Sequence, residues 1–359
     1  MQGAVLYGVH SPLQIEEIEV GEPDADQVRV RLLASGVCHS DWHVIKGDWP
    51  HIPLPCVLGH EGAGVVESLG PGIHDLAVGD HVTLSWRPNC GICEMCQRGY
   101  PSLCDVPVHG GDRPLVNRTG ERVNRMASLG TFSHATIVPR SAVVAIPADV
   151  PFDVAALIGC GVMTGVGAVI NTAQVEAGRS VAVFGCGGVG LNVIQGCKLV
   201  GADPIIAVDI RENKLEMARQ FGATHTVNAS QEDPVARIQA ITGGGSHYAF
   251  EAIGLSGEPF RQAILCTRKR GVTVFVGHAP FDTPVNLDAR MLMHEKMVIG
   301  SYYGTARPHV DFPRLIQLYR QGLLLLDELV TRRYALADVN EAFAALARGE
   351  VARSVLMME

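Results

Sequence analysis

One stretch of the chain, from Val181 to Asp209, limits the possible folds more than any other. It begins with an apolar run, Val181–Phe184, of the kind that forms a buried strand. The sequence GCGGVG follows at residues 185–190, and a helical pattern then leads to a second apolar run that ends in Asp209. Strand, glycine turn, helix, strand and acid in this order predict a dinucleotide-binding unit.

The glycine turn explains how such a unit would hold a pyrophosphate. Its first glycine permits a tight turn, its second lets the backbone approach the phosphates, and its third lets the helix pack closely on the strand. The N–H groups at the helix start would face the phosphates, whose charge the helix dipole favours. The candidate cofactor-binding residues of the turn are Gly185, Gly187, Gly188, Val189 and Gly190.

The acid at the end of the second strand distinguishes between the two nicotinamide cofactors. A carboxylate at Asp209 can accept hydrogen bonds from the ribose hydroxyls, but it would repel a 2′-phosphate. We therefore predict NAD rather than NADP, although Arg211 follows two residues later.

Composition excludes several classes of partner. The formal charge of −8 argues against nucleic acid and anionic membranes. No stretch of eighteen residues is apolar without polar or glycine interruption, and the first twenty residues lack the pattern of a signal peptide. Ten cysteines in clusters indicate metal binding rather than disulfides, so we expect a protein of the reducing cytoplasm.

The order of the predicted elements suggests two domains in 359 residues. Short strands separated by turns, beginning with Gln27–Ala34, predict a compact antiparallel region up to about Pro147. Beyond Asp209, strands and helices alternate as far as Val276, which predicts a parallel sheet covered by helices. Near the C-terminus, Asp338–Arg348 is a predicted helix that opens with Asp338 and Glu341 as a capping pair. The predicted fold class is α/β.

Four cysteines within fifteen residues form the densest cluster of metal-ligating side chains. Four thiolates on a short loop can close a tetrahedral shell around Zn²⁺, which is typical of a structural site. An iron–sulfur cluster and scattered free thiols are the alternatives, because iron–sulfur loops have similar spacings. The four residues are Cys90, Cys93, Cys96 and Cys104.

A second candidate metal site is dispersed along the chain. Cys38, His60 and Cys160 would supply two thiolates and one imidazole with a fourth position free, as in a catalytic zinc site. Taken singly, each has a simpler interpretation, because a lone cysteine is usually a small apolar residue and a lone histidine a satisfied polar one. Composition alone cannot select these three.

Together, these motifs resemble the zinc-dependent medium-chain alcohol dehydrogenase family along essentially the whole chain. The resemblance implies a GroES-like β-rich catalytic domain at residues 1–161 and 302–359, with the structural zinc lobe at about 88–106. A Rossmann doubly wound parallel sheet at 162–301 would be inserted in it. It further implies two zinc ions per chain, with Cys38, His60 and Cys160 on the catalytic ion. Glu61 would lie beside this ion, either as an alternate ligand or in contact with the ligands. Asp41 would support the ligand histidine.

The same resemblance implies roles for residues around the zinc. Ser40 would accept the alcohol proton, and a path through the cofactor ribose would lead to His43 and solvent. The alternative for His43 is an exposed turn residue. His39 and Arg353 would contact the pyrophosphate, and Trp86 would line the substrate pocket with Trp49 near its mouth. Core packing is the alternative for Trp86.

Three functions remain open from the sequence. The first is an NAD-dependent alcohol dehydrogenase that interconverts alcohols and aldehydes or ketones. The second is oxidation of a thiol–formaldehyde adduct, or reduction of its nitroso analogue, because the chain resembles class III-type enzymes near the mycothiol-dependent branch. The resemblance implies that enzymes acting on glutathione adducts carry an anion-binding Arg a few residues after the last lobe cysteine. The run Asp105-Val106-Pro107-Val108 has no Arg, which argues against glutathione adducts as substrates. The third is a non-catalytic nucleotide-binding regulator. A homodimer is expected, with a homotetramer as the alternative.

Overall fold

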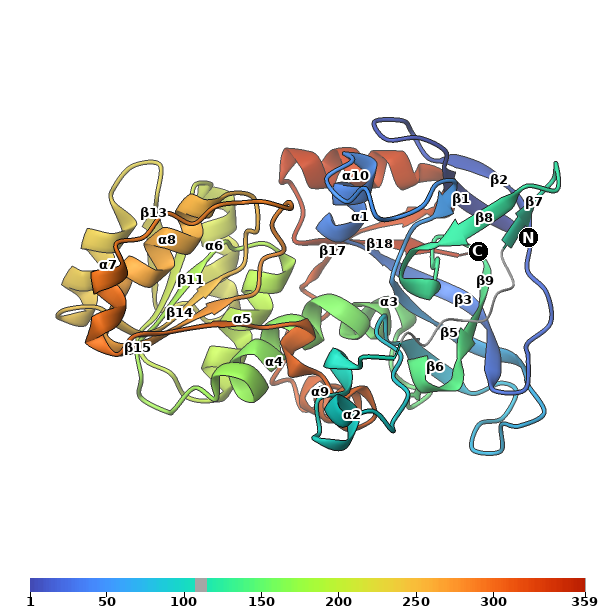
Figure 1. Ribbon diagram of the computed structural model, residues 1–359, viewed down its shortest axis with the longest axis horizontal. Coiled ribbons are helices and arrows are strands. Elements are labelled where there is room, and N and C mark those ends of the chain that lie inside the picture. The colour runs from blue at the N-terminus through green and yellow to red at the C-terminus, as the bar shows by residue number, and fades with distance from the viewer. Residues whose placement is uncertain (107–114, 359) are drawn as a thin grey trace. The chain divides into compact units, whose positions relative to one another are not determined.

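The computed structural model describes residues 1–106 and 115–358, and within them the chain divides into two compact units (Figure 1). Unit 1 comprises Met1–Cys160, Arg307–Gly322 and Leu326–Glu359. Unit 2 comprises Gly161–Ala306 and Leu323–Leu325.

Unit 2 is built on a six-stranded sheet in which every neighbouring pair is parallel. The strand order is β13-β12-β11-β14-β15-β16, which is the order of a doubly wound dinucleotide-binding fold. The Rossmann prediction is thereby confirmed. The strands are β11 (Val181–Phe184), β12 (Ile205–Asp209), β13 (His225–Asn228), β14 (Ser246–Glu251), β15 (Thr267–Phe275) and β16 (Met297–Gly300). The helices between them are α5 (Gly188–Leu199), α6 (Glu212–Phe221), α7 (Pro234–Thr242) and α8 (Gly257–Cys266).

Burial on both faces explains why these strands are continuous apolar runs. All four residues of β11 are buried, and Phe184 packs with Val208 and Ala263 in the core of this unit. Strand β14 ends at Glu251. There the side chain of Glu251 accepts hydrogen bonds from the N–H groups of the next loop, which closes a turn.

Unit 1 is the expected β-rich region and contains a closed barrel and a larger sheet. The barrel has the order β1-β2-β7-β8-β4, and the sheet the order β10-β6-β5-β3-β18-β17, with β9 also on β3. The barrel strands are β1 (Gln2–Leu6), β2 (Gln14–Glu19), β4 (Cys56–Val57), β7 (Leu115–Asn117) and β8 (Arg122–Arg125). The sheet strands are β3 (Gln27–Val37), β5 (Glu61–Leu69), β6 (His81–Leu84), β9 (Ala135–Pro139), β10 (Val143–Ala145), β17 (Val330–Ala335) and β18 (Arg353–Met357).

The long strand β3 is the centre of unit 1 and positions the site described below. It pairs antiparallel with β5 in a register that sets Gly36 opposite Glu61. Only glycine fits there, since a Cβ on Gly36 would lie 2.0 Å from Glu61 Oε2. Helix α3 (Phe152–Leu157) packs against β3 and β5, and α1 (His39–Ile45) follows β3 directly.

Two helices lie near the C-terminus, and the sequence prediction for one of them needs correction. Helix α10 (Val339–Arg348) forms as expected, but within the described chain Asp338 makes no side-chain capping bond. Glu341 instead pairs with Arg348 at 3.0 Å, so the predicted capping box is wrong. Helix α9 (Pro308–Arg320) begins at Pro308, because proline is well suited to the first turn of a helix.

One continuous helical run, Phe152–Ala173, is long and apolar enough to cross a membrane. It includes α3, α4 (Met163–Gly167) and two π-helical turns. Of its most apolar window, 94% is buried inside the protein. The core helix of a globular protein has this property, so the run is weak evidence for a membrane span.

Candidate active site

The first part of the site is the junction between β3 and α1. Cys38 precedes the first helical residue and is buried. Its N–H donates to Asp41 Oδ2 at 3.2 Å, which fixes the start of the helix. Asp41 is itself fully buried in the helix's first turn, where the macrodipole favours a carboxylate.

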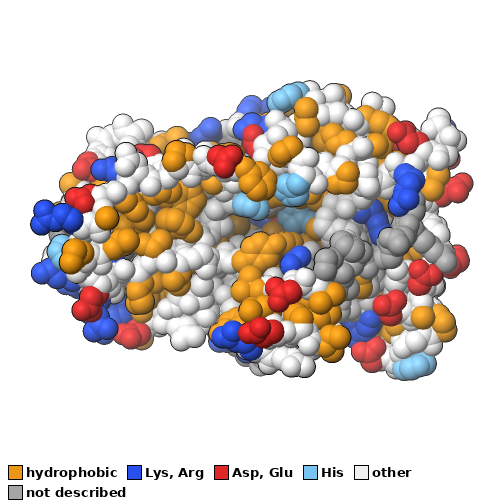
Figure 2. All heavy atoms as spheres, viewed as in Figure 1, with side chains coloured by type: hydrophobic (Ala, Val, Ile, Leu, Met, Phe, Trp, Pro, Cys, Tyr) orange, Lys and Arg blue, Asp and Glu red, His pale blue; other side chains and the backbone are white. Residues whose placement is uncertain are grey.

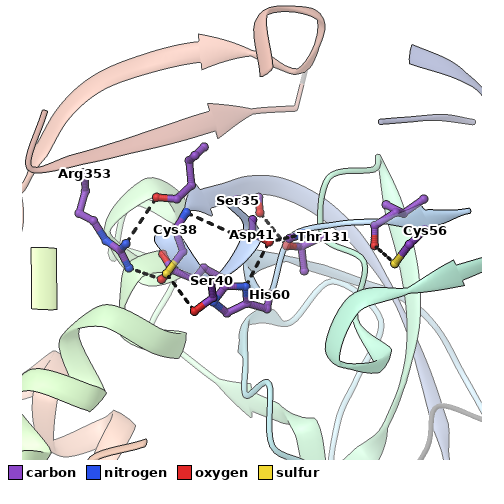
Figure 3. A network of polar contacts seen from close by, with 12 residues as sticks. Ser35, Cys38, Ser40, Asp41, Cys56, His60, Thr131 and Arg353 are labelled. Atoms are coloured by element: carbon purple, nitrogen blue, oxygen red, sulfur yellow. Dashed lines mark hydrogen bonds and ion pairs between the residues drawn. The ribbon is translucent and has the colours of Figure 1, made fainter. Parts of the chain in front are cut away.

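The Asp41 carboxylate also orients the histidine of the site (Figure 3). Its Oδ1 accepts from Gly59 N–H at 2.8 Å and lies 3.3 Å from His60 Nδ1. The contact that the resemblance implied between Asp41 and the histidine is thus present. Because Nδ1 faces the carboxylate, Nε2 is the ring nitrogen left for another partner. Nε2 is buried and has no hydrogen-bond partner among the described residues.

Cys160 completes the site from a distant part of the sequence. It lies in a π-helical turn, Ile158–Val162, which continues α3. The neighbouring glycine is needed for this approach, since a Cβ on Gly159 would lie 2.4 Å from the carbonyl oxygen of Leu84. The ligand atoms of four buried residues lie within 4.8 Å of one another, and the residues are Cys38, His60, Glu61 and Cys160.

This donor set fits a zinc ion. Two sulfurs, one imidazole nitrogen and one carboxylate oxygen are ligands that Zn²⁺ accepts at tetrahedral spacing. Two of the candidate atoms, His60 Nε2 and Glu61 Oε2, are buried without a hydrogen-bond partner in the described chain. Such atoms are costly to bury unless they bind something. The four residues are therefore candidate ligands of one metal ion.

A buried ion pair flanks these ligands. Arg353, on β18, donates to a carboxylate oxygen of Glu61 and to the carbonyl oxygen of Val37. Burial raises the pKa of Glu61 to about 7, and the guanidinium opposes that rise. A hydrogen bond from the Cys160 thiol holds the pKa of Cys38 well below its ordinary value, with a further contribution from Arg353. The site thus favours a thiolate at Cys38, which is the metal-binding form.

The four-cysteine lobe forms a second, separate cluster in unit 1. Cys93 precedes the short helix α2 (Glu94–Gln97), and Cys93 N–H donates to Cys90 Sγ at 3.3 Å. The backbone N–H groups of Cys96 and Asp105 lower the pKa of Cys93 to about 6. Sulfur atoms of Cys90, Cys93, Cys96 and Cys104 lie within 4.8 Å of one another, and none forms a disulfide. Four such sulfurs fit a closed zinc shell.

The predicted relay residues lie on α1, beside the first site. Ser40 Oγ lies 3.7 Å from Cys38 Sγ. His43 is only 4% exposed, so the exposed-turn alternative is wrong. Its Nδ1 lies 2.8 Å from Asp48 Oδ2, a contact that the sequence analysis did not anticipate.

The two tryptophans predicted to line a pocket lie against histidines of unit 1. The ring of Trp86 meets His60 edge-on, with ring centroids 6.5 Å apart. Trp49 is buried and stacks on His43, with centroids 5.3 Å apart and planes inclined by 15°. His39, the predicted pyrophosphate contact on α1, is exposed.

In unit 2, the glycine turn has the geometry that a phosphate site needs. Gly185 has a φ of +92°, and a Cβ there would lie 2.6 Å from Ile253. A Cβ on Gly190 would lie 1.8 Å from the carbonyl oxygen of Gly185, so the helix packs on the turn. At Gly187, by contrast, a Cβ would meet no described atom within 4 Å, which leaves room beside the backbone at the start of α5.

The acid at the end of β12 is held by backbone groups. Asp209 Oδ2 accepts from Cys186 N–H at 2.9 Å, and Oδ1 accepts from Arg211 N–H at 3.0 Å. The sequence analysis missed Lys214 nearby, whose position five residues after the acid was the available signal. Burial lowers the pKa of Lys214, while the Asp209 carboxylate partly restores it.

Comparisons with known proteins agree with this geometry. A family model described as "Alcohol dehydrogenase GroES-like domain" matches residues 24–148, and one described as "Zinc-binding dehydrogenase" matches residues 188–321. The chain is 38% identical over 366 residues to "Alcohol dehydrogenase B" of Mycobacterium tuberculosis, covering 99% of this chain and 97% of that one. It is 37% identical over 374 residues to "Alcohol dehydrogenase class-3" of Cereibacter sphaeroides, covering 99% of both.

A solved structure extends the likeness to three dimensions. The crystal structure of benzyl alcohol dehydrogenase from Acinetobacter calcoaceticus matches with a TM-score of 0.93 and 34% identity, covering 100% of this chain and 99% of that one. Fold, sequence and family models therefore agree over nearly the whole chain. The chain belongs to the zinc-dependent medium-chain alcohol dehydrogenase family, with the class III-like enzymes among its relatives.

Proposed function

We propose that this protein interconverts alcohols and aldehydes or ketones by hydride transfer to or from NAD, with zinc held by Cys38, His60 and Cys160. The observation that carries the proposal is the buried donor set in which His60 Nε2 lacks a protein partner within the described residues. A zinc ion bound there would act as a Lewis acid and lower the pKa of an alcohol hydroxyl. Glu61 would serve as an alternate ligand.

The residues of the chain have separate tasks in this reaction. Asp41 keeps His60 Nε2 directed at the metal, and Arg353 offsets the charge of Glu61. Ser40 is the candidate acceptor of the alcohol proton, and His43 is the candidate group that passes it to solvent. Gly185, Gly187, Gly188, Val189, Gly190 and Asp209 would bind the cofactor, with His39 and Arg353 as further contacts.

The experiment is to follow NADH absorbance over a panel of alcohols and to count metal ions by elemental analysis. We expect two zinc ions per chain and turnover with at least one alcohol. Cys160→Ala should lose one zinc ion and turnover but keep NADH binding. The matched control is Cys266→Ala, which removes a buried cysteine of unit 2 that belongs to neither cluster. Turnover by Cys160→Ala at the parental rate would refute the proposed metal site.

We infer that flat or extended apolar alcohols are preferred over bulky branched ones. The support is the ring of Trp86, whose edge-on contact with His60 sets an indole beside the candidate metal ligands. A solved relative is named for benzyl alcohol, which is flat and apolar. A higher kcat/KM for a bulky branched primary alcohol, such as 2,2-dimethyl-1-propanol, than for benzyl alcohol or 1-hexanol would overturn this inference.

Oxidation of a thiol–formaldehyde adduct is the second candidate function, supported by the class-3 name of one relative. The run after the last lobe cysteine offers no Arg for a glutathione carboxylate, and its Pro107 and Val108 lie outside the described residues. Formaldehyde oxidation that requires added mycothiol or glutathione would favour this function over the first.

We propose that the protein forms a homodimer through β16, at the end of the sheet of unit 2. This strand pairs with β15 on one side and is the last described strand on the other. Met297 on it is 52% exposed, and Met293 before it is 81% exposed. Figure 2 shows apolar side chains gathered on one face of this unit. An unpaired apolar edge favours a second copy. Sedimentation should show a dimer that Met297→Lys weakens, whereas a tetramer would require a further interface.

A reducing compartment, the cytoplasm, is the location we infer. All ten cysteines lie in the described part of the chain, and none is in a disulfide. Six of them lie in the two candidate metal clusters and the other four are buried free thiols, and a reducing medium preserves both forms. Thiol titration of protein purified without reductant, after denaturation with chelator, should find all ten free.

A further inference from the structure

The turn that follows α1 brings a carboxylate back onto the helix. Asp48 N–H donates to the carbonyl oxygen of His43 at 2.9 Å, and Lys46 N–H donates to that of Trp42 at 2.9 Å. Gly47, between them, has a φ of +76°, which favours glycine. The chain therefore reverses within five residues, and the Asp48 side chain comes to lie beside the His43 ring.

The contact determines which ring nitrogen carries a proton. Asp48 Oδ2 lies 2.8 Å from His43 Nδ1, and an ionised carboxylate only accepts hydrogen bonds. The hydrogen bond from His43 lowers the pKa of Asp48, and Lys46 contributes further, so this carboxyl is ionised at neutral pH. Nδ1 is consequently the donor, and Nε2 is left as the basic nitrogen.

Stacking fixes the plane of the ring as the carboxylate fixes its tautomer. Trp49 lies nearly parallel to His43, at 5.3 Å between centroids. The other ionisable groups next to this pair are Lys46, whose Nζ is 3.4 Å from Asp48 Oδ2, and His51, on Trp49 at 6.1 Å. The carboxylate of Asp48 lies within hydrogen-bond distance of the imidazole of His43.

We propose that Asp48 is a positioning residue for proton transfer: it holds His43 with Nε2 free to take a proton, and it stabilises the imidazolium that results. The inference rests on the proposed alcohol dehydrogenase function, in which His43 passes the alcohol proton to solvent. The proton transfer needs no added reactant, because the proton that His43 Nε2 takes up is then released to water. The other ring proton stays on Nδ1, hydrogen-bonded to Asp48.

The test is kcat/KM against pH for Asp48→Asn, with one alcohol and saturating NAD⁺. Without the carboxylate the imidazolium loses its partner, so we expect a loss of about tenfold in kcat/KM. This is less than the roughly 10²–10⁴-fold that a general base itself contributes, because the imidazole is still present. The acidic limb of the profile should move to lower pH. The matched control is Asp75→Asn, which removes another ionised aspartate of unit 1 whose partner is Arg140. That variant should behave as the parent.

A double variant and a spectroscopic measurement separate this role from a structural one. In the His43→Gln background, Asp48→Asn should cost nothing further, because the ring it positions is gone. Nitrogen-15 NMR of the parent should show the Nδ1–H tautomer of His43, and Asp48→Asn should lower its population. This inference alone would be overturned if Asp48→Asn had the same dependence of kcat/KM on pH as the parent. It would also be overturned if Asp48→Asn lowered kcat/KM in the His43→Gln background as much as it does in the parent. A parental His43→Gln would overturn the relay and this inference together.

Discussion

Glu251, a buried acid of unit 2, gives a prediction about stability that is independent of catalysis. It ends β14 between β11 and β15, opposite Phe184 and Phe275, and it is fully buried. Its Oε1 accepts from Ile253 N–H at 2.9 Å and Gly254 N–H at 2.8 Å. Its Oε2 has no hydrogen-bond partner in the described part of the chain. One oxygen of this carboxyl is thus satisfied and the other is not.

Burial raises the pKa of Glu251 from 4.5 to about 7, against the opposing effect of the backbone N–H groups. The folded protein therefore binds this proton more tightly than the unfolded chain does. Between about pH 4.5 and 7 the folded state holds more protons, so the free energy of unfolding falls as pH rises through this window. Since each pKa unit is worth about 1.4 kcal/mol, the full loss is about 3 kcal/mol above pH 7.

Glu251→Gln tests this value, because the amide keeps an oxygen for the two N–H groups and cannot ionise. We expect the variant to gain up to about 3 kcal/mol relative to the parent between pH 5 and pH 8. The measurement is the free energy of unfolding of both proteins across this range, followed by circular dichroism. Comparing two proteins at each pH cancels the titration of all other groups, metal ligands included.

The control is Glu258→Gln, which removes an exposed acid from the neighbouring helix α8. Its difference from the parent should not change with pH. If the difference between Glu251→Gln and the parent is equally flat, the Glu251 carboxyl does not titrate in this window and the reasoning from burial is refuted.

Three further predictions concern the metal and cofactor sites. Asp209→Ala should narrow a preference of at least roughly tenfold for NAD⁺ over NADP⁺, measured as kcat/KM; an unchanged ratio would show that other groups set it. Cys93→Ser should release the lobe metal and lower the unfolding temperature, because a short lobe depends on its ion; elemental analysis finding two zinc ions would contradict this. Ser40→Ala should lower kcat/KM by about 10²–10⁴-fold. His43→Gln should lower it less, and a higher pH should partly restore it, because water can replace the imidazole that lies further from the substrate. Equal losses for the two variants at every pH would argue against this order of proton transfer.

Local patterns in the sequence were sufficient to predict unit 2. β11, the glycine turn, α5 and β12 follow one another within thirty residues, and each has its own signature of apolar periodicity or glycine. The cysteine lobe was predictable for the same reason, since its four sulfurs lie within fifteen residues. Burial of both sheet faces makes the strands continuous apolar runs, which are easy to locate in the sequence.

The dispersed site could not be derived from such patterns. Cys38, His60 and Cys160 come together only through the pairing of β3 with β5 and the packing of α3 on both. These contacts join segments up to about a hundred residues apart, and no periodicity encodes them. The family resemblance, rather than spacing, singled out these three residues.

For three acids of the chain, the sequence shows the residue type but not the groups that the fold places against the carboxylate. Asp41, Asp48 and Glu251 are all visible as carboxylates, yet the structure gives each a different task. Asp41 faces Gly59 N–H and an imidazole 19 positions away, so it orients a candidate metal ligand. Asp48 meets a second imidazole across a glycine turn, so it stays ionised and fixes a tautomer. Glu251 accepts hydrogen bonds from backbone N–H groups in an apolar sheet, and its burial favours the neutral form of the carboxyl. The direction in which each acid acts follows from the donors that the fold places against it.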